Sequence, residues 1–131
     1  MHHQYNKPGS CRITKVYRHF PGTPADDSIG KSCSFYTRET WDAAAIDHCT
    51  RMSGTAVTGG TSQSIRIDHV DDGAGGYQNF WGNWRIGRKG DYLVTFDNCK
   101  GFMDKIYGKC GGYGGWSNTD FGTIFGECIR I

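Results

Sequence analysis

The stretch NCKGFMDKIYGKC, residues 98–110, gives the strongest indication of the fold. Its apolar side chains recur at helical spacing and form one stripe, made of Cys99, Phe102, Met103, Ile106 and Cys110. Asp97 or Asn98 is expected to cap the start of this helix, and Gly111-Gly112 to end it. A helix with one apolar stripe needs a second layer to cover it, so the stretch predicts a layered domain.

A second amphipathic helix is expected from Thr37 to Met52. Trp41, Ala45, Cys49 and Met52 share a face, and Thr37 or Thr40 can cap the start. Gly54 suits the left-handed residue past the end. His48 is expected at the boundary between the apolar and polar faces.

Short alternating segments elsewhere predict strands, separated by turns at 53–61 and 71–76 and by a hairpin tip at Lys89-Gly90. The expected strands are Cys11–Phe20, Ser64–Val70, Gly76–Ile86, Asp91–Phe96 and Thr123–Ile131. This order of elements predicts an α+β fold, a two-layer sandwich in which two helices pack on an antiparallel sheet in a split βαβ-like arrangement.

Six cysteines are expected to form three disulfides: Cys11, Cys33, Cys49, Cys99, Cys110 and Cys128. They form no Cys-x-x-Cys pair, and no histidine lies at zinc-finger spacing, so free thiols and a metal site are the weaker alternatives. Cys99 and Cys110 are separated by about three helical turns, so each should pair with another element. Fifteen pairings are open.

Length and composition favour one secreted domain. The 131 residues fit a single unit over 11–131, with 1–10 as a flexible N-terminus or a tag remnant. Fifteen basic and thirteen acidic residues are too balanced for a protein driven onto nucleic acid by its charge. No transmembrane segment is expected, and the lack of an apolar leader suggests a mature, extracellular form whose signal peptide has been removed.

The C-terminal third carries a family resemblance. Cys99-x10-Cys110-Gly-Gly is followed by Trp116, an acidic turn at Asp120 and the Gly126-Glu127-Cys128 ending. This pattern resembles small cysteine-rich secreted fungal proteins, including mushroom glycan-binding proteins and smut-fungus killer toxins. The resemblance implies a fungal origin, an extracellular location, and either glycan binding or toxicity.

Residues 77–86 supply the main candidate ligand site. If they form a strand, Phe80, Trp84 and Ile86 belong to the core and the alternate residues face away. Those alternate side chains combine aromatic rings with polar groups suited to a sugar, and they are Tyr77, Asn79, Trp81, Asn83 and Arg85. In the alternative interpretation they cover a sheet edge or a partly buried second face, and a slip of one residue would exchange the two sets.

A glycine-rich loop at 111–118 supplies a second candidate. Tyr113 and Trp116 could stack on a sugar, or pack on the core after the helix ends. Catalysis is not expected, because His69 has no assured partner, although Glu39 or Glu127 could converge on it in a ribonuclease. No cofactor and no metal are expected.

These patterns lead to three functional hypotheses. The first is a lectin-like protein that binds a glycan or glycoprotein on a target cell surface in defence or in host or competitor interaction, with a homodimer supplying multivalency. The second is an antifungal protein similar to killer toxins, or a host-directed effector. The third is a small ribonuclease.

Overall fold

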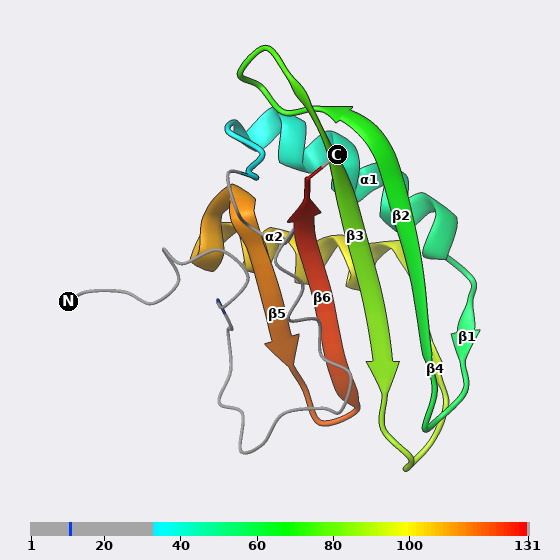
Figure 1. Cartoon of the computed structure of the whole chain (residues 1–131). Helices are drawn as coiled ribbons and strands as arrows, with labels where there is room; N and C mark the ends of the chain where they lie inside the picture. Colours follow the sequence, from blue (N-terminus) through cyan, green and yellow to red (C-terminus); the bar gives the residue numbers. More distant parts are fainter. Residues whose placement is uncertain (1–10, 12–32, 131) are drawn as a thin grey trace, which may run out of the picture.

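The computed structural model describes Cys11 and residues 33–130, and within these ranges the chain forms two layers (Figure 1). One layer is a four-stranded antiparallel sheet in the order β2-β3-β6-β5, and the other is a pair of helices. The elements are α1 (Arg38–Met52), β1 (Ala56–Val57), β2 (Ser62–Asp71), β3 (Tyr77–Ile86), β4 (Tyr92–Leu93), α2 (Phe96–Cys110), a 3₁₀ helix (Gly111–Tyr113), β5 (Gly114–Asn118) and β6 (Gly122–Ile129).

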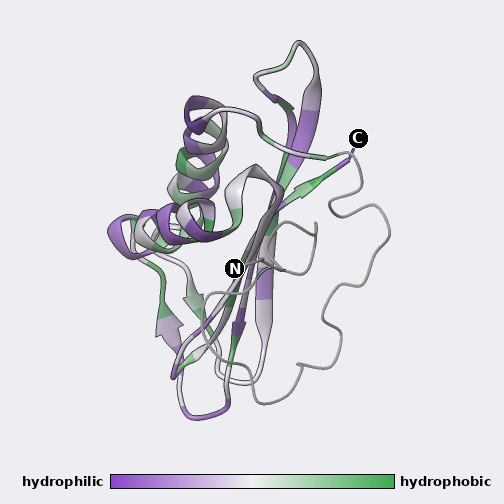
Figure 2. Ribbon diagram, turned by 90° about the vertical axis from the view of Figure 1, so that its left-hand side faces the viewer, coloured by the Kyte–Doolittle hydropathy of each residue, from purple (hydrophilic) through white to green (hydrophobic). Residues whose placement is uncertain are grey.

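The topology confirms the α+β sandwich with a split βαβ unit. β3 and β5 both pair antiparallel with β6, so they run parallel to each other with β6 between them, and α2 makes the connection. β1 and β4 form a separate two-stranded sheet. Figure 2 shows both helices on one side of the main sheet. We call the opposite side of this sheet the outer face.

The core lies between the helices and the sheet. Trp41 on α1 packs edge-on against Phe80 on β3, and its indole N–H donates to the carbonyl of Met103 on α2 at 3.1 Å. All three side chains are fully buried. No helix in the described part of the chain is long and apolar enough to cross a bilayer.

The three predicted disulfides are present, and they link Cys11 to Cys110, Cys33 to Cys128, and Cys49 to Cys99. Cys99 and Cys110 therefore pair with different elements, as their helical spacing predicts. The Cys49–Cys99 bond joins α1 to α2 directly. The strand expected over Cys11–Phe20 lies outside the described residues except for Cys11, as does the segment 1–10.

The helix starts show one correct and one wrong prediction. α1 begins after Thr37, whose hydroxyl accepts from the Thr40 amide. α2 begins earlier than predicted, because Thr95 provides the cap by accepting from the Asn98 amide. The strand predicted over Asp91–Phe96 therefore shortens to Tyr92–Leu93, and Lys89-Gly90 connects two sheets rather than turning a hairpin.

The glycine-rich segment 111–118 contains a strand, and the prediction of a loop there is wrong. A Cβ on Gly114 would lie 2.2 Å from the Gly126 carbonyl oxygen, and one on Gly115 would lie 2.3 Å from that of Cys11. These glycines therefore allow backbones to pack closely. They do not mark a loop in this part of the chain.

His48 is fully buried between α1 and the sheet, so its predicted place at a polar boundary is wrong. Its Nδ1 donates to the Ile65 carbonyl and its Nε2 accepts from the Trp84 indole, both at 3.2 Å. The neutral ring satisfies both partners. Burial accordingly lowers the pKa of His48 to about 4.

Candidate functional site

The register of β3 places the predicted ligand-binding residues of that strand on the outer face. Phe80, Trp84 and Ile86 are buried on the helix side, as the alternation predicts. The alternate set therefore faces away from the helices, and consists of Tyr77, Asn79, Trp81, Asn83 and Arg85. The structure divides this set into two groups.

The first group forms a cluster around Phe125 on β6. The rings of Trp81 and Trp116 tilt against Phe125 at centroid distances of 5.6 and 5.8 Å. The Arg85 guanidinium lies 5.2 Å from the same ring. Asn83 pairs directly with Phe125 but is only 3% exposed, and Trp116 is 8% exposed. The cluster is therefore largely buried in the described structure.

Glu127 adds a carboxyl group to this cluster. It pairs with Trp81 across β3 and β6 and is 2% exposed. Burial raises the pKa of Glu127 to about 8, and the nearby Arg85 opposes only part of that shift. Glu127 Oε1 and Asn83 Oδ1 accept no hydrogen bond from any residue that the structure describes. Near neutral pH the carboxyl group is therefore mostly protonated.

The second group lies at the far end of β3. Tyr77 stacks on His69 with the ring centroids 3.9 Å apart, and the Asn79 side-chain oxygen accepts from the His69 amide at 2.9 Å. His69 occupies a bulge in β2 with φ of +59°. Asn79 thus supports the bulge. No hydrogen bond or ion pair between described residues joins His69 to Glu39 or Glu127.

The two candidate residues of the segment 111–118 lie in different places. Trp116 lies on β5 within the outer-face cluster, whereas Tyr113 ends the 3₁₀ helix and is half-buried. The structure therefore brings Trp116 together with Trp81, Asn83 and Arg85. It does not bring Tyr77, Asn79 or Tyr113 into that cluster.

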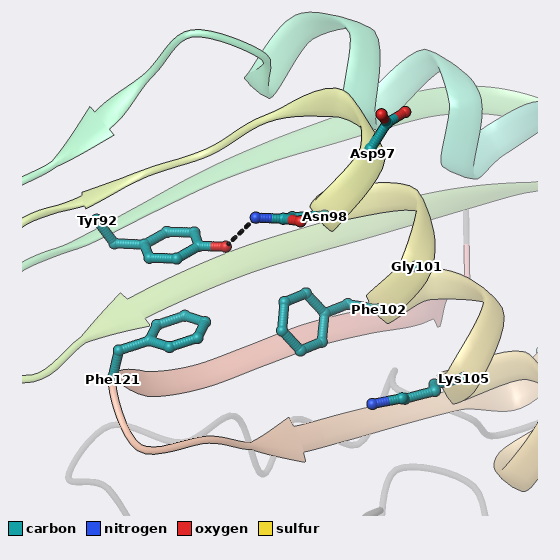
Figure 3. A pocket seen from close by; sticks show the side chains of 7 residues that line it. All are labelled: Tyr92, Asp97, Asn98, Gly101, Phe102, Lys105 and Phe121. Carbon is teal, nitrogen blue, oxygen red and sulfur yellow. Dashed lines mark hydrogen bonds between the residues drawn. The ribbon is translucent and has the colours of Figure 1, made fainter.

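An open pocket lies at the opposite end of the sheet from His69, where α2 begins (Figure 3). Its volume is about 400 Å³, within the range of small-molecule sites. We call it the aromatic pocket, and its lining residues are Tyr92, Asp97, Asn98, Gly101, Phe102, Lys105 and Phe121. Three separate elements supply its rings: β4, α2 and the turn between β5 and β6.

The rings of this pocket are held in place by their neighbours. Tyr92 and Phe121 stack in parallel at 4.1 Å, and Phe102 meets Phe121 edge-on at 6.0 Å. The Tyr92 hydroxyl accepts a hydrogen bond from the side-chain amide of Asn98 at 3.2 Å. Thr119 fixes the turn that carries Phe121 by accepting from the amides of Phe121 and Gly122. The aromatic surface is therefore preorganised.

Gly101 leaves the α2 side of the pocket without a side chain. It lies inside the helix, where glycine costs about 1 kcal/mol relative to alanine. A Cβ at this position would meet no atom within 4 Å. Packing in the described structure therefore does not require glycine at position 101. The missing side chain leaves the pocket wider on this side.

The sequence patterns do not indicate this pocket. They place Phe102 in a helix stripe, Tyr92 on a strand face and Phe121 in a turn, and only the fold brings these rings together. Gly101 is a weak local sign, since a glycine is unfavourable inside a predicted helix, but Gly108 shares that property and lies outside the pocket.

Comparisons with known proteins add no assignment. No protein-family model matches the chain, and no curated protein and no solved structure shows significant similarity to it. The resemblance to fungal glycan-binding proteins and killer toxins therefore stays a prediction. Among the described residues, no three histidine, cysteine or acidic side chains gather as metal ligands would.

Proposed function

We propose that the protein is a secreted carbohydrate-binding protein and that it binds sugar in the aromatic pocket. The observation that carries the proposal is the combination of three fixed rings with exposed polar groups around an open cavity. A sugar ring has an apolar C–H face and a rim of hydroxyls, so it needs an aromatic surface beside hydrogen-bonding groups.

The polar groups at the pocket match that requirement. Asn98 offers a side-chain amide that donates and accepts, and Lys105 donates. The Tyr92 hydroxyl is already oriented by Asn98. Groups that are ordered before binding lose little entropy when a ligand arrives.

Three disulfides support the extracellular part of the proposal. Disulfides persist in oxidising compartments and are rare in the cytosol. An extracellular lectin would meet the glycans of a target cell surface. Binding at one shallow site is expected to be weak, so multivalent presentation would raise the apparent affinity.

The direct test is a glycan array with a pair of matched variants on α2. Gly101→Gln places a side chain at the pocket, and its Cβ would meet no atom within 4 Å. Gly108→Gln makes the same change on the same helix, also into open space and outside the pocket. We expect Gly101→Gln to lose at least tenfold in affinity and Gly108→Gln to bind as the wild type does.

Trp81→Ala separates this site from the outer-face cluster. If the pocket is the site, Trp81→Ala retains binding as long as circular dichroism shows that it folds. Binding lost in folded Trp81→Ala but kept in Gly101→Gln would move the site to the outer face. An array on which the wild type binds no glycan would remove the proposed function.

A further inference from the structure

Lys105 brings a positive charge to the aromatic pocket, and no ion pair joins it to an acidic side chain of the described residues. Lys100, on the same helix, lies 2.6 Å from Asp104 and 3.3 Å from Asp42. Asp104, the sequence neighbour of Lys105, is thus already engaged by Lys100, and it also meets Arg38 at 3.4 Å. Among the described residues, no carboxylate lies within ion-pair distance of Lys105.

The charged end of Lys105 lies beside one ring of the pocket. The Lys105 ammonium lies 5.9 Å from the centre of the Phe102 ring. Figure 3 shows its side chain extending along the same side of the pocket as Phe121, whereas the Asp97 carboxylate points away from the rings. A ligand that packs on the rings would therefore lie closer to the Lys105 ammonium than to the Asp97 carboxylate.

We propose that the preferred ligand is an acidic oligosaccharide, one whose sugar rings carry a carboxylate as uronic acids do. This inference rests on the proposed function and adds the substrate class. The carboxylate of a uronic acid is attached to the edge of the pyranose ring. When the C–H face packs on an aromatic surface, the carboxylate extends to the rim, where Lys105 can donate to it.

The charge of the whole protein is compatible with this ligand. The formal net charge is +2, so an acidic polysaccharide is not repelled. Neutral hydroxyls of the same sugar can reach Asn98 at the exposed start of α2. The rings would then bind sugars in general, and Lys105 would give the preference for an acidic sugar.

The test compares short uronic acid oligomers with their methyl esters, which keep the sugar ring and remove the charge. We expect the wild type to bind the acid about fivefold more tightly than the ester at low salt, which is the scale of one exposed ion pair. This preference should shrink in concentrated salt because ions screen exposed charges.

Variants of one side chain assign the preference to Lys105. Lys105→Met keeps the apolar stem and is expected to bind acid and ester equally, whereas Lys105→Arg should restore the preference. Lys109→Met, on the same helix but outside the pocket lining, serves as the matched control and should keep it.

The outcomes separate the two proposals. Equal binding of acid and ester by the wild type, with binding still lost in Gly101→Gln, would overturn the acidic ligand and leave carbohydrate binding intact. A preference for the acid that survives in Lys105→Met would overturn the assignment of carboxylate recognition to Lys105 and to this pocket. No binding of any sugar would remove both proposals.

Discussion

The absence of a side chain at Gly82 sets the distance between α1 and the sheet. A Cβ at this position would lie 2.1 Å from the His48 ring, which is held by hydrogen bonds to two different elements. The ring cannot move without breaking at least one of these bonds. Gly82→Ala is therefore expected to lower the free energy of unfolding by about 3 kcal/mol, measured by urea denaturation.

Gly90→Ala is the control for this substitution. A methyl group at Gly90 would meet no atom within 4 Å, and the residue lies in an exposed connection, so its replacement should leave the urea midpoint nearly unchanged. Equal midpoints for the two variants would show that His48 and the sheet can separate freely.

Glu127 predicts how stability changes with pH. Its pKa is about 8 in the folded protein and near 4.5 when unfolded, so the folded state holds the proton more tightly. Stability from this group is complete below pH 4.5 and is lost as the pH rises through 8. We expect the wild type to lose about 1 kcal/mol between about pH 7 and 9, and Glu127→Gln to lose much less.

His48 acts in the opposite direction and in a lower window. Its folded pKa of about 4 lies below the ordinary 6.5, so the unfolded state takes up the proton first as the pH falls. Stability from His48 is therefore lost between pH 6.5 and 4. Because this window ends below neutral pH, unfolding measured above pH 7 contains no contribution from His48. If the unfolding free energy of Glu127→Gln changed with pH as steeply as that of the wild type in this range, the assignment to Glu127 would be contradicted.

At the scale of single elements, Thr95 decides where α2 begins. Its hydroxyl accepts a hydrogen bond from the backbone N–H of Asn98, which would otherwise lack a partner in the first turn. Thr95→Ala is expected to lower the free energy of unfolding by about 1 kcal/mol. Asp97→Ala tests the cap that the sequence predicts, and a larger loss in Asp97→Ala than in Thr95→Ala would reverse our assignment.

The elements also show where sequence periodicity succeeds and where it fails. The stripe of α2 and the alternation of β3 are predicted correctly, because each is a local consequence of burying one face. The sequence patterns do not predict β5, because Gly114 and Gly115 look like loop residues. In the structure they allow close backbone contacts with Gly126 and Cys11. Such contacts depend on segments that are distant in the sequence.

At the scale of the whole molecule, the sequence predicts the layers but not the pocket. Its rings come from β4, α2 and the turn after β5, and no periodicity within one segment relates them. The outer-face cluster is predicted in part, since Trp81, Asn83 and Arg85 alternate along one strand. Its burial and the inclusion of Glu127 follow from the pairing of β3 with β6.

The disulfide that joins the two helices is expected to contribute a large part of the stability. Cys49 and Cys99 are separated by 50 residues, and closing a loop of that length stabilises a fold by about 3–4 kcal/mol through the unfolded chain. The double variant Cys49→Ala/Cys99→Ala should lose this amount in urea denaturation. Since small domains have only about 5–15 kcal/mol in total, reduction of all three bonds is expected to unfold the protein.

Full reduction should also abolish sugar binding, because α2 provides one wall of the aromatic pocket and is tied to the fold by both Cys99 and Cys110. Circular dichroism and glycan binding measured across a titration with reductant should change together. If the reduced protein keeps both its fold and its affinity, the bonds are not needed for function. The disulfides would then give no support for an oxidising, extracellular setting.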